Sequence, residues 1–304
     1  MEKNANIYKE VSLMENYQIE NQDLLLALSE KGAELIRIYD KKRERDVLWD
    51  ANPAFWARHA PILFPNVGRH YGNTYQVDGH TYPSKQHGFA RDSVFTLVKR
   101  EDASITQSLS SSEETKETYP FDFLLTVCHT LNCRQITVSW TVTNTGNVPM
   151  YFTIGGHPAF RVPVLPGTSQ KDYLLQFRKE RAVSYHLIDP ATGTALPKTY
   201  SLELKDGTCP IGEHLFDHDA LIFDEEIDYA GIAFPDGTPY LSLEADGFSN
   251  FGIWSVPGAP FVCLEPWMGR CDDYGFTGEL KDKKWIQSLA PGKTFSAQYR
   301  ITLS

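Results

Sequence analysis

Apolar and polar residues alternate with a period of two over long stretches of the chain. In residues 135–146 (QITVSWTVTNTG) four apolar residues alternate with polar ones before the segment ends in a glycine turn. The alternation returns at the end of the sequence, where every second residue from 295 to 303 is apolar. Side chains two positions apart lie on the same face of a strand, so these segments are predicted to be strands with one buried face.

Shorter segments with the same character occur along the whole chain and are bounded by Gly, Pro, Asn and Asp. One helix is predicted, over residues 52–61 (NPAFWARHAP), where Pro61 would end it. Many short strands with so little helix between them exclude a parallel βαβ architecture and favour an antiparallel sandwich or barrel. The predicted short strands lie within 24–30 (LLLALSE), 33–40 (AELIRIYD), 240–246 (YLSLEAD), 251–256 (FGIWSV) and 261–265 (FVCLE).

The organisation of the chain is predicted to be simple. The 304 residues contain no repeat of fixed period, no low-complexity tract and no composition typical of a linker. All-β sandwiches of about 250 residues commonly form one unit. We therefore expect a single domain over residues 1–304.

Charge and cysteine content limit the partners and the compartment. The formal net charge is −10, and the basic run 41–45 (KKRER) is interrupted by Glu44 and followed by Asp46, so nucleic acid and anionic membranes are disfavoured as partners. No apolar stretch reaches the length of a membrane span, and MEKNANIYKE does not resemble a leader. Five cysteines without a C-x-x-C pair favour free thiols in the cytoplasm. A small molecule is the expected partner, for a monomer or a homodimer.

Two segments place basic residues in glycine-containing turns. In 61–75 (PILFPNVGRHYGNTY), Arg69 follows an Asn-Val-Gly turn, which suits contact with a polar ligand but equally a solvated arginine. In 85–92 (KQHGFARD), His87 precedes a glycine, Arg91 follows four residues later, and Asp92 can pair with Arg91. His87 is compatible with a structural as well as a catalytic role.

Two further segments place a titratable residue beside a buried strand. In 151–160 (YFTIGGHPAF), two glycines precede His157, and we expect them to leave open space beside the imidazole, with Phe160 as a wall. In 261–269 (FVCLEPWMG), Glu265 is expected at the end of a buried strand beside Trp267. An apolar setting of this kind raises the pKa of a carboxyl group toward that of a useful base, although an exposed carboxylate at a strand end would fit the pattern too.

The sequence shows no pattern for a cofactor or a metal. It contains no P-loop, G-x-G-x-x-G, G-x-S-x-G or H-E-x-x-H. His214 and His218 lie four residues apart, but their segment lacks the periodicity of a helix, so a zinc site there is not predicted. We expect neither a cofactor nor a bound metal.

In their order and spacing these segments resemble the aldose 1-epimerase (galactose mutarotase) family, and within it the LacX-like subgroup of small bacterial proteins. The resemblance covers essentially the whole chain and implies a large antiparallel β-sandwich, called a supersandwich, with the sugar lying across one concave sheet. The matching motifs are NVGR (66–69), QHGFAR (86–91), GGHPAF (155–160), DHDALIF (217–223) and CLEPWMG (263–269).

The resemblance also implies roles for individual residues. It gives Glu265 the role of general base and His157 that of general acid. The substrate-binding positions implied are Arg69 and His87 near the ring oxygen and the C1 hydroxyl, Asp219 at the sugar hydroxyls, and Arg91 and Trp267 beside them.

The function expected from this resemblance is a mutarotase that interconverts the anomers of a hexose by acid/base ring opening. Related enzymes for hexose 6-phosphates carry an arginine where this chain has Val67, although Arg69 and Arg91 could still hold an anion. A hexose-6-phosphate 1-epimerase therefore stays as an alternative, as does a sugar-binding protein without catalysis on the same scaffold. A glycoside hydrolase would need a second carboxylate across the bond, which the segments do not supply.

Overall fold

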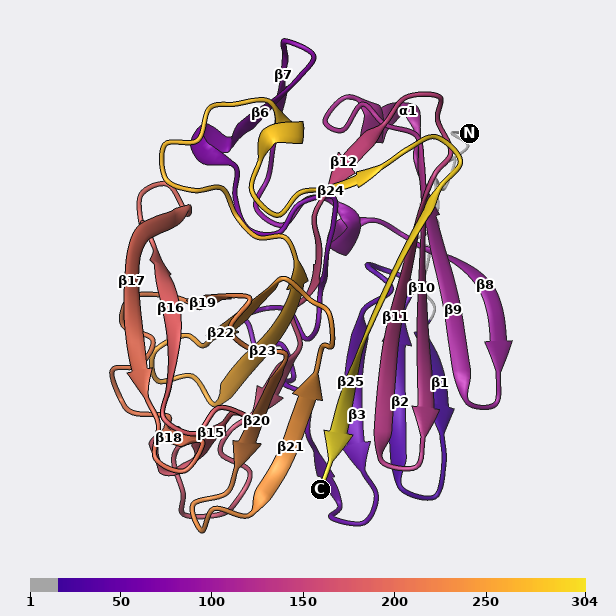
Figure 1. Cartoon of the computed structure of the whole chain (residues 1–304). Coiled ribbons are helices and arrows are strands. Elements are labelled where there is room, and N and C mark those ends of the chain that lie inside the picture. Colours follow the sequence, from indigo (N-terminus) through magenta and orange to yellow (C-terminus); the bar gives the residue numbers. More distant parts are fainter. Residues whose placement is uncertain (1–15) are drawn as a thin grey trace, which may run out of the picture.

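The computed structural model describes residues 16–304, and strands make up nearly all of its regular structure (Figure 1). The described strands form five sheets, two of them large, and neighbouring strands pair antiparallel, as residues 123–132 do with residues 135–144. The prediction of an antiparallel all-β fold is confirmed. No helix within the described residues is long and apolar enough to cross a membrane.

The first large sheet has nine strands and contains the segments with the clearest alternation. Along β10 and β11, buried and partly exposed residues alternate at almost every position, and β25 buries the odd-numbered residues from 299 to 303. The order is β18 (Thr208–Pro210), β15 (Leu174–Gln176), β20 (Tyr229–Ala233), β21 (Pro239–Glu244), β25 (Thr294–Leu303), β11 (Gln135–Asn144), β10 (Phe123–Asn132), β9 (Ser104–Ser110) and β8 (Thr96–Glu101).

The second large sheet has eight strands and carries the candidate site. Strand β23, which is buried from residue 261 to residue 267, is paired on one side with β22 and on the other with both β13 and β14. The order is β17 (Ala195–Glu203), β16 (Ala182–Ile188), β19 (Leu221–Asp224), β22 (Asn250–Trp254), β23 (Phe261–Met268), β13 (Ile154–Gly156) and β5 (Ile62–Leu63), with β14 (Ala159–Arg161) beside β23.

The remaining elements are short. A four-stranded sheet contains β1 (Asn16–Glu20), β2 (Leu24–Ser29), β3 (Leu35–Asp40) and β4 (Arg45–Asp46), and two hairpin-sized sheets pair β6 (Thr74–Val77) with β7 (His80–Pro83) and β12 (Met150–Phe152) with β24 (Gln287–Leu289). The helical elements are α1 (Glu113–Lys116) and 3₁₀ turns at Tyr71–Asn73, Ala90–Asp92, Gln170–Asp172 and Leu280–Asp282.

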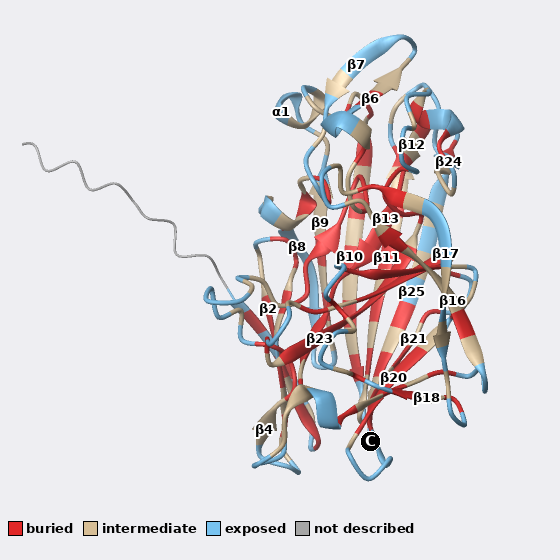
Figure 2. Ribbon diagram, turned by 90° about the vertical axis from the view of Figure 1, so that its left-hand side faces the viewer, coloured by how far each residue is buried: buried red, intermediate tan, exposed pale blue. Residues whose placement is uncertain are grey.

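One continuous apolar core joins the three larger sheets. It contains Leu26 of β2, Val127 of β10 and Leu264 of β23, each completely buried. Figure 2 shows buried residues concentrated along the central strands, whereas the β6–β7 hairpin at the top is largely exposed. Burial on this scale, at about 25 cal/mol per Å² of apolar surface, is the main source of stability.

The predicted helix over residues 52–61 is wrong. The segment forms only turns: the side-chain oxygen of Asn52 accepts from the Ala54 N–H (3.0 Å), and its carbonyl accepts from the N–H of Trp56 (3.1 Å). No helix follows, because the next backbone groups bond elsewhere: the N–H groups of His59 (2.8 Å) and Ala60 (2.9 Å) donate to the Glu34 carboxylate. The turns bring Trp56 toward the eight-stranded sheet, where it contacts the candidate site.

Candidate active site

Strand β23 presents alternate side chains to two different surroundings, since successive residues of a strand point to opposite faces. Val262 and Leu264 pack into the main core, whereas Cys263, Glu265 and Trp267 face away from it. On that opposite face Glu265 and Trp267 line a cavity of about 370 Å³. The strand does not end at Glu265, as the sequence had suggested, but continues to residue 268.

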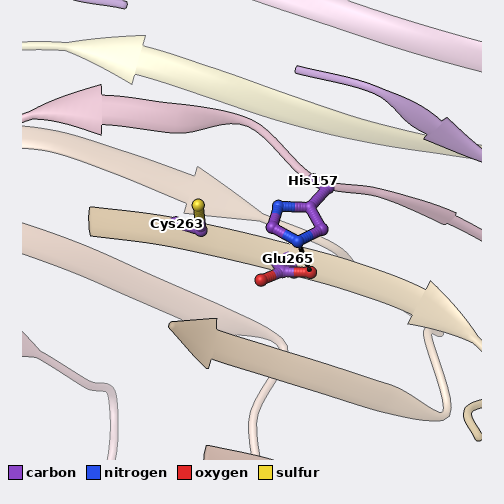
Figure 3. A group of neighbouring side chains, drawn as sticks. All are labelled: His157, Cys263 and Glu265. Carbon is purple, nitrogen blue, oxygen red and sulfur yellow. Dashed lines mark ion pairs between the residues drawn. The ribbon is translucent and has the colours of Figure 1, made fainter. Parts of the chain in front are cut away.

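His157 lies beside Glu265 because the chain turns between β13 and β14, both of which pair with β23. The His157 backbone N–H donates to the carbonyl of Pro61 (3.1 Å), which fixes this turn. Figure 3 shows the imidazole placed directly over the carboxylate. Nε2 of His157 lies 3.2 Å from Oε2 of Glu265, and the two residues are only 6% and 1% exposed. The expected acid and base are therefore in direct contact.

Burial shifts the two members of this pair in opposite directions. It lowers the pKa of His157 to about 3, with the positive charges of Arg91 and Arg58 acting the same way. It raises the pKa of Glu265 well above its ordinary value, and the negative charge of Asp219 adds to that rise. Both shifts favour the form of the pair in which Glu265 holds a proton and the imidazole of His157 is neutral.

The two glycines before His157 do not leave open space, contrary to the sequence expectation. A Cβ on Gly155 would lie 2.4 Å from the indole of Trp267, and one on Gly156 would lie 3.0 Å from the ring of Tyr299. Gly252 on the other side of β23 is equally close to the same indole, at 2.4 Å. Gly155 and Gly252 thus accommodate Trp267, which forms part of the cavity floor, and Gly156 accommodates Tyr299. Phe160 is completely buried in the main core and forms no wall of the cavity.

His87 is brought to the cavity by a strained turn. Its φ angle is +66°, a left-handed conformation that non-glycine residues adopt rarely and mainly at functional or tightly constrained positions. The Gly68 backbone N–H donates to Nδ1 of His87 (3.0 Å), so this nitrogen is unprotonated and Nε2 carries the proton of the neutral ring. Burial, followed by the charge of His157, lowers the pKa of His87 well below its usual value. A neutral His87 can donate a hydrogen bond from Nε2.

Arg69 and Asp219 lie at the rim of the same cavity. The Arg69 guanidinium donates to Asn73 (3.4 Å) and Gln86 (3.3 Å), and its side chain passes over Gly193, where a Cβ would come within 2.5 Å. Asp219 is exposed and, like His87, has a left-handed backbone, with φ +71°. Both side chains retain hydrogen-bonding capacity for a polar ligand.

Arg91 also reaches the cavity and is more firmly held. It donates to the carbonyl of Gln86 (2.7 Å), and burial lowers the pKa of Arg91 to about 10. Its expected partner Asp92 is 3.9 Å away and makes a shorter ion pair with Arg58, at 2.9 Å. All seven predicted site residues are therefore found around one cavity.

The sequence did not identify several residues that complete the cavity wall. Trp56 and Trp254 stand beside His157, and a loop that follows β16 covers one side of the cavity. Nothing local in the sequence marked these two tryptophans as parts of a site. The loop contributes Asp189, Pro190, Ala191 and Gly193.

One group of metal-ligand type occurs among residues 16–304. The ligand atoms of His157, Cys263 and Glu265 lie within 4.8 Å of one another. Burial, reinforced by the negative charge of Glu265, raises the pKa of the Cys263 thiol well above its usual value, so Cys263 remains a neutral thiol rather than the thiolate that binds metals. The close contact of His157 with Glu265 fits proton transfer better than coordination.

Comparison with known proteins agrees with this architecture. The family model described as aldose 1-epimerase matches residues 15–302, so the chain belongs to the aldose 1-epimerase family. Among individual relatives, it is 31% identical to the chromosomal Protein LacX of Lactococcus lactis subsp. lactis, over 94% of this chain and 98% of the relative. The resemblance predicted from the motifs is confirmed.

Two solved structures are particularly similar. One is a galactose mutarotase related enzyme from Lactobacillus acidophilus, with a TM-score of 0.89 and 29% identity over 95% of this chain and 97% of that one. The other is a galactose mutarotase-like protein from Lactobacillus casei, with a TM-score of 0.87 and 29% identity over 95% and 100% of the two chains. These similarities establish the galactose mutarotase-like fold.

Proposed function

We propose that the protein is an aldose 1-epimerase that interconverts the α and β anomers of a hexose without a cofactor. The observation that carries the proposal is the buried contact between Nε2 of His157 and Oε2 of Glu265, 3.2 Å apart, beside a cavity of about 370 Å³. A sugar-binding protein has no need of a buried acid and base in contact. A hemiacetal carbon, by contrast, carries two oxygens that exchange protons when the ring opens.

In the proposed reaction the pair uses the one proton that it holds. Glu265 as carboxylate takes the C1 hydroxyl proton while His157 as imidazolium gives a proton to the ring oxygen, so the C1–O5 bond breaks and C1 becomes a carbonyl. Rotation about C1–C2 exposes the other carbonyl face. The ring hydroxyl then attacks, returning its proton to His157, and Glu265 returns a proton to the new C1 hydroxyl. Such proton transfers each contribute about 10²–10⁴-fold.

The other site residues position the sugar in this proposal. Neutral His87 donates toward the ring oxygen or the C1 hydroxyl, and Asp219 accepts from hydroxyl groups farther along the ring. Arg69 and Arg91 donate to the remaining oxygens, and the Trp267 indole forms the apolar floor. The cavity wall thus combines charged and polar side chains with the faces of tryptophans, which suits a ligand rich in hydroxyl groups.

Polarimetry of freshly dissolved pure anomers tests the function. The panel contains several free aldohexoses and their 6-phosphates, each assayed with the dialysed protein in the presence of a chelator. Acceleration for at least one free sugar is the expected result, and acceleration for the phosphates alone would favour a hexose-6-phosphate 1-epimerase. Binding without acceleration of any sugar would leave the non-catalytic alternative and contradict the proposal.

Replacing His157 and Arg69 is expected to affect different kinetic constants. His157→Asn removes a proton donor that acts in the transition state, so kcat should fall by about 10²-fold or more with little change in KM. Arg69→Ala removes a contact made in the ground and transition states alike, so KM should rise more than kcat falls. Initial-rate measurements over a range of sugar concentrations separate the two effects.

The pH profile gives a second readout for His157. Wild-type kcat/KM should form a broad plateau, because the one-proton state persists between the low pKa of His157 and the high pKa of Glu265. In His157→Asn the remaining carboxyl is active only when ionised, so activity should rise with pH and the basic limb should disappear. If the decline in activity at high pH persists in this variant, His157 is not the general acid, and His87 becomes the next candidate for that role.

A further inference from the structure

Trp56 presents the face of its indole to the imidazole of His157. The two ring centroids are 4.7 Å apart, and the planes are inclined by only 27°. The other aromatic neighbours of His157 stand nearly perpendicular to it: Trp254 at 5.6 Å and 86°, and His87 at 5.6 Å and 83°. Among the described aromatic contacts of His157, the contact with Trp56 is thus the single stacked one.

The position of this indole is fixed by contacts that do not involve the sugar cavity. The carbonyl of Trp56 accepts a hydrogen bond from Nε1 of Trp49 (2.9 Å), and its backbone N–H closes the turn to Asn52 (3.1 Å). The indole also stacks on Phe261 of β23, with centroids 5.8 Å apart and planes inclined by 28°. A loop residue held in this way can impose an orientation on the histidine that it covers.

A protonated His157 has few other stabilising contacts. Its Nε2 faces Glu265, but its Nδ1 is buried without a hydrogen-bond partner, and nearby positive charges oppose protonation. An aromatic face is the negative end of a quadrupole and attracts a cation within about 6 Å, most strongly for tryptophan. The titratable and charged groups around the imidazole are Glu265 and Cys263 from β23, His87 and Arg91 from the 85–92 segment, and Arg58 from the 52–61 segment.

We propose that Trp56 is a positioning residue that holds the His157 imidazole flat against its indole and stabilises the protonated form of that ring. The proton shared by His157 and Glu265 can reside on either partner, and only the imidazolium–carboxylate form has the acid and the base in their working states. By favouring the proton on His157, Trp56 increases the fraction of the pair in that form. The kinetic consequence rests on the proposed mutarotase function, whereas the location of the proton does not.

Nuclear magnetic resonance of the imidazole nitrogens measures where the proton lies, independently of turnover. The His157 signals are assigned by their loss in His157→Asn. In Trp56→Leu, which keeps apolar bulk but removes the aromatic face, the imidazolium-to-neutral ratio should be reduced about three- to thirtyfold at any given pH. The pH at which the Nε2 shift reports protonation of the ring should therefore fall. Trp56→Phe keeps a weaker face and should be intermediate, and the matched control Trp285→Leu, outside the cavity, should leave the signal unchanged.

The turnover number should change in proportion to the fraction of His157 that is protonated. In Trp56→Leu, kcat should fall by the same factor as the imidazolium ratio, whereas KM, which also reflects the loss of part of the cavity wall, should change less than kcat, and Trp56→Phe should recover part of the loss in kcat. An unchanged pH for the Nε2 titration, or a higher one, would overturn the inference and leave Trp56 as a shield against water. Should the wild type accelerate no sugar, the proposed function fails but the nitrogen shifts still decide the role of Trp56.

Discussion

Glu265→Gln is expected to reduce anomer interconversion by about 10²–10⁴-fold, the usual contribution of a general base. The amide has nearly the shape of the carboxyl group but cannot accept the C1 hydroxyl proton. The fold should be retained, because Glu265 is 1% exposed and an uncharged amide is easier to bury there than a carboxylate. Anomer exchange followed by polarimetry, together with thermal unfolding, measures both effects.

A suitable control is Glu203→Gln, the same change on the exposed strand β17, which should leave the rate unaltered. If Glu265→Gln keeps more than about a tenth of the wild-type turnover, Glu265 is not the base. The neighbouring carboxylate at the cavity rim, Asp219, would then be the next residue to examine.

Lys283→Met is expected to lower the free energy of unfolding by about 3–5 kcal/mol, the cost of leaving one member of a buried ion pair unpaired. Lys283 and Asp272 form an ion pair in which both side chains are only 2% exposed. The Asp272 carboxylate also contacts Nδ1 of His70 (3.1 Å) and accepts from the backbone N–H of Tyr71 (2.8 Å). Urea denaturation at neutral pH measures the loss.

Two further variants identify the cause. Lys99→Met breaks an exposed pair with Glu101 and should cost no more than about 1 kcal/mol. In the double variant Lys283→Met/Asp272→Asn, the unpaired buried carboxylate of Asp272 is also removed, so part of the stability should be recovered. A loss below about 1 kcal/mol in Lys283→Met would mean that water or His70 replaces the lysine.

The same carboxylate links stability to pH in the wild type. Burial alone would raise the pKa of Asp272, but the hydrogen bond from His70 and the charge of Lys283 bring it to about 2, below the ordinary value of 3.8. A lowered pKa of a carboxyl group stabilises the folded state above the unfolded value. This contribution is therefore present above about pH 4 and is lost as the pH falls toward 2.

The parts of the fold that follow from local pattern could be predicted. Strands β10, β11 and β25 have one buried and one partly exposed face, so burial imposes the alternation that the sequence displays. The run before Glu265 was predicted as a buried strand for a different reason, because its four residues are all apolar, and β23 is indeed buried on both faces. The full length of this strand was not predicted, because a proline follows Glu265. In the structure β23 continues through Pro266, which pairs with Phe251 of β22.

The features that sequence reasoning missed depend on contacts between distant segments. Gly155 and Gly156 suggested free space, since the sequence cannot show that Trp267 and Tyr299 occupy it. Trp56 lay in a segment predicted to be helical, and only its hydrogen bond with Trp49 and its contact with His157 reveal its position. Motifs located His157 and Glu265 because each is flanked by unusual neighbours, whereas the residues that support them carry no local signature.

The indole of Trp267 lies closely against Gly155 and Gly252, so the part of the site around it cannot accommodate substitutions, whereas another part can. A methyl group on Gly155 or Gly252 would lie 2.4 Å from the ring. Any residue larger than glycine at either position would therefore displace the Trp267 indole and strand β23 with it. The loop at 189–193 borders the same cavity without belonging to a sheet. A search for altered ligand preference, by selection or by design, should therefore vary Pro190 and Ala191 of this loop and leave Gly193, which lies under Arg69, and Trp267 unchanged.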